Sequence, residues 1–431
     1  MFKNLITLAA LAATALSADV PTVTAKGSKF FFSNGTQYFI KGVAYQLTPD
    51  DPLINGKQCQ LDADLMQKLG ANTIRVYHVN SGADHSSCMT TFANAGIYLF
   101  VDLDTFSTQI DPDTPFWNTT QLDAFQKVMD EFQKYPNTAG FFVGNEVLTT
   151  GNNSVAAPYV KAAARDTKAY RDSKGYRKIP IGYSAADIPD LRPMLQNYLA
   201  CGSNASEALD FYSLNAYEWC GNSGYDQSGY SQLQANASDY NIPIFLSETG
   251  CIKPEPRDFA DQAAIFGDQM SGTWSGAIIY EWIQEANNYG LISYGPKGPA
   301  SDTANPDGYT RTGTPTPVSP DFSNLQAQWA TLSPKGVSAN DYSPSLTAPP
   351  CPVYTANDWA VNGDVALPTL GQTFNAEVQS SITGGPPAGQ TASGGSASSS
   401  STSSAGVGDT YQIAGIGTGL SGLLFGVMLW L

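Results

Sequence analysis

Two glutamates stand two and three positions after short apolar runs, and their type and spacing are suited to chemistry. Glu248 follows the run at 243–246 (PIFL), and Glu146 follows the run at 141–143 (FFV). Such runs are typical of strands that are buried on both faces. An unpaired carboxylate costs several kcal/mol to bury, so each glutamate is expected where a strand ends and a cleft opens. The pattern predicts two carboxyl groups that meet across one cleft.

The elements that would position this pair alternate between strands and helices. Helical periodicity is seen at 121–134 and 258–270, between apolar segments of strand length. Strands that alternate with helices form parallel sheets with right-handed crossovers, and eight repeats in about 300 residues favour a closed barrel. We therefore predict an α/β fold, a (β/α)8 TIM barrel with a short C-terminal extension. The predicted strands are 41–45, 73–79, 98–103, 138–145, 179–184, 209–216, 243–247 and 276–282.

The active site of such a barrel lies at the carboxyl ends of its strands. Glu146 ends the fourth predicted strand and Glu248 ends the seventh. Polar and aromatic residues occur at the matching ends of other strands, so they are expected to face the same mouth. These residues are Tyr77, His78, Asp102, Asp104, Tyr217, Trp219, Tyr280 and Trp282.

Two facing carboxyl groups surrounded by aromatic residues suit the cleavage of glycosidic bonds. A separation of roughly 5 to 5.5 Å gives a retaining mechanism, and a narrow barrel favours that short distance. We assign Glu248 as the ionised nucleophile. Glu146 is assigned as the acid/base, with a pKa raised by neighbouring negative charge and partial burial.

The remaining candidates would bind the sugar. Asn145 would hold the sugar 2-hydroxyl, and Tyr280 would hydrogen-bond the nucleophile. Flat aromatic faces suited to stacking on sugar rings are offered by Tyr77, Tyr217, Trp219 and Trp282.

Each of these residues also has a structural interpretation. Core packing is an alternative role for Tyr77, Asp102 and Tyr217, and a slot facing a helix is an alternative for Trp282. Glu218 and Glu281 are the nearest rivals for the catalytic pair. Each adjoins a favoured residue, and neighbouring positions on a strand face opposite sides of the sheet.

Composition narrows the class of ligand. The 431 residues contain 22 Lys and Arg against 38 Asp and Glu, a net charge of -16, which argues against nucleic acid as a partner. Six cysteines in a secreted chain indicate three disulfides, for which fifteen connectivities exist. No C-x-x-C pair occurs and the only histidines are His78 and His85, so neither a zinc site nor a Ser-His-Asp triad is expected. We expect no metal and no cofactor.

The two ends of the chain predict secretion and anchoring. Residues 1–18 resemble a signal peptide. The catalytic region with its extension is expected at 19–382, a Ser/Gly-rich linker at 383–405, and a removable glycosylphosphatidylinositol (GPI) anchor signal at 406–431. A tail-anchored helix is the alternative, but no Lys or Arg follows Lys335. The candidate N-glycosylation sites are Asn34, Asn118, Asn152, Asn204 and Asn236.

The sequence contains the motifs 74–77 (IRVY), 144–147 (GNEV), 215–221 (NAYEWCG), 247–251 (SETGC), 280–282 (YEW) and 289–291 (YGL). Together these motifs resemble those of the fungal GPI-anchored β-1,3-glucanosyltransferases of glycoside hydrolase family 72. The resemblance covers about residues 20–350, and the C-terminal stalk and anchor signal also fit. It implies an enzyme of the cell wall, at the extracellular face of the plasma membrane. Such an enzyme cleaves an internal β-1,3-glucan linkage and transfers the new reducing end to the non-reducing end of another chain.

The resemblance also implies roles for single residues. Glu146 would be the acid/base and Glu248 the nucleophile, and the donor site would be lined by Tyr77, Asp102, Asn145, Tyr217 and Tyr280. The implied disulfides are Cys59 to Cys88, Cys201 to Cys351 and Cys220 to Cys251. The implied partners are glucan donor and acceptor chains and, through a lipid anchor, the plasma membrane. We expect a monomer.

The sequence departs from the family pattern in three places. Only Cys351 lies beyond Cys251, so the additional cysteine-rich carbohydrate-binding module of some members is not expected. Thr249 stands where many members have Tyr, and the segment 104–111 (DTFSTQID) differs from the usual loop after the third strand. Two alternatives to a transferase remain, a plain endo-β-1,3-glucanase and a non-catalytic wall protein that only binds glucan.

Overall fold

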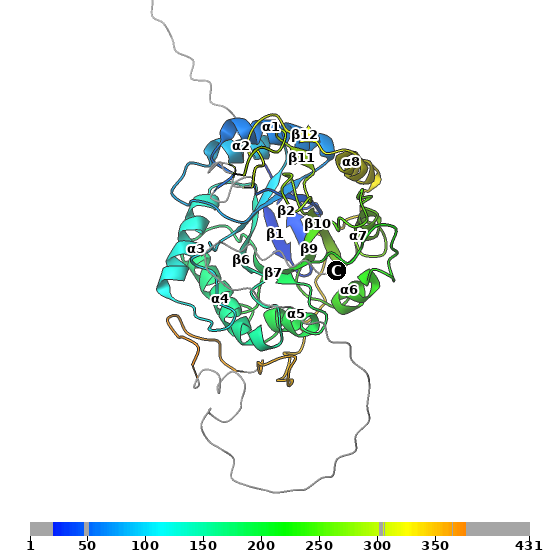
Figure 1. Cartoon of the computed structure of the whole chain (residues 1–431). Coiled ribbons are helices and arrows are strands. Elements are labelled where there is room, and N and C mark those ends of the chain that lie inside the picture. Colours follow the sequence, from blue (N-terminus) through cyan, green and yellow to red (C-terminus); the bar gives the residue numbers. More distant parts are fainter. Residues whose placement is uncertain (1–19, 47–50, 301–304, 306, 364, 376–431) are drawn as a thin grey trace, which may run out of the picture. The chain divides into compact units, whose positions relative to one another are not determined.

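Eight parallel strands form a closed barrel in the computed structural model, which describes residues 20–46, 51–300, 305, 307–363 and 365–375. The strands follow one another around the barrel in chain order, and β10 pairs with β3 to close it (Figure 1). The predicted (β/α)8 barrel is therefore confirmed. The strands are Ile40–Ala44 (β3), Thr73–Val76 (β4), Tyr98–Asp102 (β5), Thr138–Asn145 (β6), Ile181–Ala186 (β7), Phe211–Asn215 (β8), Ile244–Thr249 (β9) and Trp274–Ile279 (β10).

Helices surround the barrel, and local sequence signals explain where some of them begin and end. The Asn118 side chain accepts from the Gln121 backbone while the Gln121 side chain accepts from the Asn118 backbone, a capping box that starts α3. Gly70 ends α1 in the left-handed conformation, with φ 91°. The helices are Gly56–Leu69 (α1), Ser86–Asn94 (α2), Thr119–Phe132 (α3), Ala157–Ser173 (α4), Arg192–Ala200 (α5), Tyr230–Ala237 (α6), Asp261–Phe266 (α7) and Asp321–Thr331 (α8), with a 3-10 turn at Asn152–Ala156.

An N-terminal hairpin that we did not predict covers the amino-terminal end of the barrel. It pairs Val23–Lys26 (β1) with Lys29–Phe32 (β2), and it lies across the barrel in Figure 1. The Phe30 ring lies 5.8 Å from that of Phe211, 6.0 Å from that of Phe100 and 6.1 Å from that of Phe245. These three rings come from barrel strands and fill the interior. The carboxyl ends of the strands are therefore left as the mouth for a site.

The predicted strand boundaries differ most at the mouth. β4 ends at Val76 and β10 ends at Ile279, each three residues before the predicted end. Side-chain alternation applies only within a strand, so the positions of residues 77–79 and 280–282 could not be derived from it. A further two-stranded sheet, Ile292–Ser293 (β11) with Thr316–Pro317 (β12), follows the barrel.

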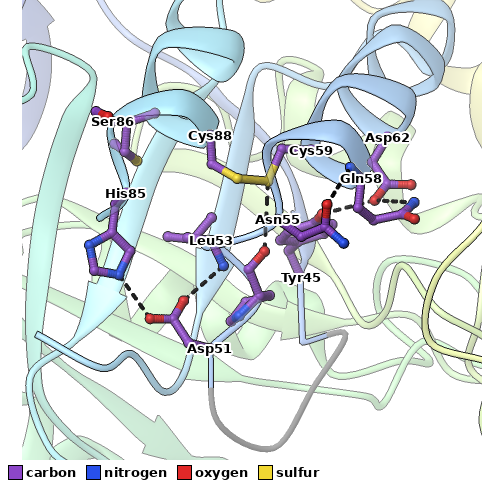
Figure 2. The surroundings of a disulfide bond; sticks show 12 residues. Tyr45, Asp51, Leu53, Asn55, Gln58, Cys59, Asp62, His85, Ser86 and Cys88 are labelled. Carbon is purple, nitrogen blue, oxygen red and sulfur yellow. Dashed lines mark hydrogen bonds and ion pairs between the residues drawn. A yellow bond between two sulfur atoms is a disulfide. The ribbon is translucent and has the colours of Figure 1, made fainter. Parts of the chain in front are cut away.

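Three disulfides join segments that are distant in sequence, and their pairings are those that the resemblance implies. Cys59 in α1 bonds Cys88 in α2. Near this disulfide, the His85 ring, just before α2, points to the Asp51 carboxylate, with Nε2 2.8 Å from Oδ2 (Figure 2). Cys220 bonds Cys251, which joins the segments after β8 and β9. Cys201, after α5, bonds Cys351 in the C-terminal extension.

Several predictions fall on residues outside the described ranges. The signal peptide at 1–18, the linker at 383–405 and the anchor signal at 406–431 all lie there. Within the described ranges, no helix is both long and apolar enough for a membrane span. Of the five candidate glycosylation sites, Asn34, Asn152 and Asn204 are exposed, and Asn118 and Asn236 are half-buried. Their modification remains a prediction.

Candidate active site

Glu248 lies within β9 and points into a set of hydrogen-bond donors. The Tyr77 hydroxyl donates to Oε1 at 2.9 Å and the Tyr217 hydroxyl donates to Oε2 at 2.8 Å. Arg75 Nη1 lies 3.4 Å from Oε1. Both carboxylate oxygens are therefore fixed in direction, as a nucleophile requires.

Burial raises the pKa of Glu248 to about 7. The charge of Glu146 acts in the same direction, whereas Arg75, Tyr217 and Tyr77 lower the pKa. We predicted an ionised Glu248, and this pKa means that the carboxylate predominates only above about pH 7 in the free enzyme. The sequence could not show this, because the burial comes from residues of several strands.

Glu146 follows β6 directly and is held from both its backbone and its side chain. Its backbone N–H donates to the Ser184 carbonyl at 2.8 Å, and its Oε1 accepts from Asn215 Nδ2 at 2.8 Å. The backbone has φ 50°, a left-handed conformation that few residues other than glycine adopt. Asn215 Nδ2 also donates to Asn145 Oδ1, which accepts from Arg75, and Arg75 contacts Glu248, so the two glutamates belong to one connected site.

Arg75 connects the parts of this site from the centre of the barrel. Its guanidinium makes two hydrogen bonds to Asp102, Nε to Oδ1 at 3.2 Å and Nη2 to Oδ2 at 2.9 Å. It also donates to Asn145 Oδ1 at 3.0 Å and to Ser184 Oγ at 3.0 Å. The side chain is fully buried. Asp102 therefore holds Arg75 in place, which agrees with the structural role that we considered as the alternative for Asp102.

Asn145 is oriented by two neighbours through its oxygen. Its Oδ1 accepts from Arg75 and, at 3.1 Å, from Asn215 Nδ2. Within the described part of the chain, its amide nitrogen donates to no protein group. That leaves a donor beside Glu146 for a sugar hydroxyl, the role that we predicted for this residue.

We predicted that Tyr280 would hydrogen-bond Glu248, but its hydroxyl bonds Gln46 instead. Its hydroxyl accepts from Gln46 Nε2 at 2.7 Å, and the same amide donates to Glu281 Oε2 at 2.7 Å. Glu281 is fully buried and also accepts from Asn287 at 2.7 Å. We placed Glu281 on the opposite face of the strand from Tyr280, and this was wrong because β10 ends before both residues. Burial raises the pKa of Glu281 to about 8, with Glu285 acting in the same direction.

Of the two tryptophans predicted to stack on sugar, Trp282 is packed inside the protein, and the role of Trp219 remains a prediction. Trp282 is fully buried, and its indole N–H donates to the Tyr294 hydroxyl at 3.2 Å. It lies beyond the end of β10, so its alternation with Tyr280 does not hold. Trp219 is half-buried, with its ring edge-to-face against Tyr230 at 5.1 Å. The rival Glu218 is more exposed and lies 3.5 Å from Arg192.

Three tyrosines form an aromatic wall beside Glu248. The ring of Tyr289 lies 5.7 Å from that of Tyr217 and 5.4 Å from that of Tyr280, in edge-to-face contact. Tyr289 is a site residue that we did not predict from the sequence. The same holds for Gln46, Arg75, Ser184 and Asn215. A signal existed for Arg75, a charged residue inside an apolar strand, and for Asn215, a polar residue at a strand end like Glu146.

The glucanosyltransferase family model, glycoside hydrolase family 72, matches residues 12–307. The chain belongs to this family. The predicted resemblance is thereby confirmed, and the site described above is that of a family 72 protein.

Curated relatives and solved structures agree with this membership. The 1,3-beta-glucanosyltransferase gas2 of Schizosaccharomyces pombe is 44% identical over 85% of this chain and 79% of its own. The 1,3-beta-glucanosyltransferase of Arthroderma benhamiae is 38% identical over 77% of this chain and 60% of its own. A Saccharomyces cerevisiae Gas2p variant in complex with laminaritetraose and laminaripentaose superposes with a TM-score of 0.72 at 35% identity, covering 80% of this chain and 74% of that one.

The hydroxyl donors on Glu248 predict a pH effect in this family 72 site. Tyr217→Phe removes a hydrogen bond that lowers the pKa of Glu248. The pKa should therefore rise, and the acidic limb of the kcat/KM profile should move to higher pH, because attack requires the carboxylate. Measuring kcat/KM from pH 4 to pH 9, with the tyrosine-to-phenylalanine change at exposed Tyr354 as control, would check this. An acidic limb unchanged or moved to lower pH would contradict the assignment of that limb to Glu248.

Proposed function

We propose that the protein is a retaining 1,3-β-glucanosyltransferase that elongates cell-wall glucan. The observation that carries the proposal is the pair of glutamates in one site, Glu248 held by two tyrosine hydroxyls and Glu146 held by Asn215. Family membership and the names of the relatives support the class of substrate. The site residues have the following roles in this proposal.

In the first step, Glu248 attacks the anomeric carbon of an internal glucosyl unit. The bond to the leaving sugar oxygen breaks as Glu146 donates a proton to that oxygen, so a glycosyl ester and a shorter glucan are formed. The Asn145 amide would donate to the 2-hydroxyl of the same sugar, a contact that strengthens as the ring flattens. Asn215 keeps the Glu146 carboxyl directed at the scissile oxygen.

In the second step, the 3-hydroxyl at the non-reducing end of another glucan attacks the same carbon. Glu146 accepts the proton of that hydroxyl, and the ester bond to Glu248 breaks. Hydrolysis would result if water attacked instead. The aromatic wall of Tyr217, Tyr280 and Tyr289 favours a sugar over water at this position, because flat apolar faces stack on sugar rings.

Incubation with a single reduced laminarioligosaccharide tests this proposal. A transferase yields products longer than the substrate as well as shorter ones. Only shorter products would indicate an endo-β-1,3-glucanase, and an unchanged substrate would indicate a glucan-binding wall protein. Either of these two results would overturn the proposed activity.

The location of the enzyme is part of the proposal. The sequence at 1–18 supports secretion, and the sequence at 406–431 supports a GPI anchor at the extracellular face of the plasma membrane. The fungal relative from Schizosaccharomyces pombe is named a 1,3-beta-glucanosyltransferase, and we propose that this enzyme likewise acts on the glucan of a cell wall. We further propose that the enzyme acts as a monomer on donor and acceptor glucan chains. Release of the protein from membranes by a phosphatidylinositol-specific phospholipase would test the anchor.

A further inference from the structure

Two buried serines lie behind the residue that holds Glu146. Ser184 in β7 and Ser247 in β9 are fully buried, and their hydroxyl oxygens lie 2.9 Å apart. Each hydroxyl donates to the side-chain oxygen of Asn215, Ser184 at 2.9 Å and Ser247 at 2.8 Å. The proposed mechanism uses neither hydroxyl. Because both are shielded from solvent, a role in the reaction has to come through their protein partner.

A shift in strand pairing brings Ser247 into this position. Leu214 pairs with Leu246, but the next residue of β8, Asn215, pairs with Glu248. β9 therefore has one extra residue here, Ser247, and such an insertion interrupts the alternation of side chains along a strand. As a result, two consecutive residues of β9 have their side chains in the site. Ser247 bonds Asn215, and Glu248 accepts from the two tyrosine hydroxyls.

The two serine hydroxyls fix which end of the Asn215 amide faces Glu146. Because the side-chain oxygen of Asn215 accepts from the serines, Nδ2 is directed to Glu146 Oε1 at 2.8 Å and to Asn145 Oδ1 at 3.1 Å. In a reversed amide, the oxygen would face these two acceptors and the hydrogen bond to Glu146 would be lost. A buried carbonyl oxygen without a donor is also unfavourable. The serines therefore stabilise the orientation in which Asn215 holds Glu146.

Ser184 and Ser247 differ in their distance from the nucleophile. Ser184 Oγ accepts from Arg75 Nη1 at 3.0 Å, and the same nitrogen lies 3.4 Å from Glu248 Oε1. Within the described part of the chain, the Ser247 hydroxyl bonds only Asn215 and Ser184. A change at Ser247 should therefore act on Glu146 with little effect on the groups that hold Glu248.

We propose that Ser247, together with Ser184, is a positioning residue for the acid/base: it fixes the Asn215 amide in the orientation that directs the Glu146 carboxyl at the scissile oxygen. The inference rests on the proposed function. Proton transfer by a positioned carboxyl contributes about 10²- to 10⁴-fold to the rate, and Ser247 supplies part of this factor. The residue before the nucleophile thus acts on the other glutamate of the pair.

The test separates proton donation from nucleophilic attack by the use of two donors, each with the enzyme in excess. The leaving group of a reduced laminarioligosaccharide needs the proton of Glu146, whereas the dinitrophenolate of dinitrophenyl β-laminaribioside does not. Ser247→Ala should cleave the oligosaccharide about 3- to 10-fold more slowly than the wild type, as expected for one lost hydrogen bond. Its release of dinitrophenolate in the first turnover should be as fast as that of the wild type.

Ser213→Ala is the matched control. Ser213 in β8 is as buried as Ser247, but its hydroxyl donates to the Tyr183 carbonyl at 3.0 Å. This change removes a buried serine hydroxyl from a neighbouring strand without altering the contacts of Asn215. The ratio of the two cleavage rates should therefore equal that of the wild type.

An unchanged ratio of the two rates in Ser247→Ala would overturn the proposal, and so would the same change of ratio in Ser213→Ala. A melting temperature close to that of the wild type shows that Ser247→Ala is folded. If it is not folded, Ser184→Ala carries the same comparison, because its hydroxyl bonds the same oxygen of Asn215. Failure of the proposed function is recognised separately, because the wild type would then form no products longer than the reduced oligosaccharide.

Discussion

Glu248→Gln should abolish turnover of β-1,3-glucan while the protein stays folded. The amide keeps the size and one acceptor oxygen of the side chain, but it cannot form the glycosyl ester. Loss of a covalent nucleophile costs about 10³-fold or more in kcat. The decrease should appear in product formation from laminarioligosaccharides, at an unchanged melting temperature. Glu248→Gln should therefore have a larger effect on activity than Tyr217→Phe.

Two further variants make this result specific to the assigned roles. Glu218→Gln alters the exposed rival carboxylate beside Tyr217 and should change kcat by less than about twofold, as expected for a surface change. Glu146→Gln should still accept a glycosyl group from a donor whose leaving group needs no proton. Mass spectrometry should then detect the glycosyl adduct in Glu146→Gln and not in Glu248→Gln. Turnover by Glu248→Gln, or an adduct on it, would show that another residue is the nucleophile.

The barrel could be predicted because its strands are encoded locally. The run 138–145 was predicted with both of its observed ends, because all but the last residue of β6 are buried and its centre, 141–143, is apolar. The β1–β2 hairpin was missed. This hairpin covers the end of a barrel formed by residues much later in the chain, where Phe30 packs against Phe211 and Phe245. Such a contact leaves no periodic signal in the hairpin itself.

The placement of the candidate site residues was predictable where a polar side chain stands at the end of a strand. Glu146 and Glu248 follow that rule, and so does Asn145. The rule failed for Trp282, which lies beyond the end of β10, where a sequence contains no information on side-chain direction. The rule also failed to predict which tyrosines hydrogen-bond Glu248. Tyr77 and Tyr217 hold Glu248, whereas Tyr280 bonds Gln46, and the difference depends on contacts between strands that are far apart in sequence.

Arg75→Met should destabilise the fold as well as the site. Arg75 is the cation between Asp102 and Glu248, and its guanidinium also lies over the rings of Tyr77 and Phe142, each with its centroid at 4.3 Å. Methionine would fill much of the space but leave the Asp102 charge buried without its partner. Breaking a buried ion pair in this way costs about 3 to 5 kcal/mol. The measurement is the free energy of unfolding in denaturant.

The charge of Arg75, rather than its volume, should account for this loss. Asp102→Asn in the Arg75→Met background removes the unpaired carboxylate, so the double variant should be more stable than the sum of the two single changes predicts. Arg165→Met removes a more exposed arginine paired with Asp166 and should cost less than about 1 kcal/mol. An Arg75→Met protein as stable as Arg165→Met would contradict the central role of this cation.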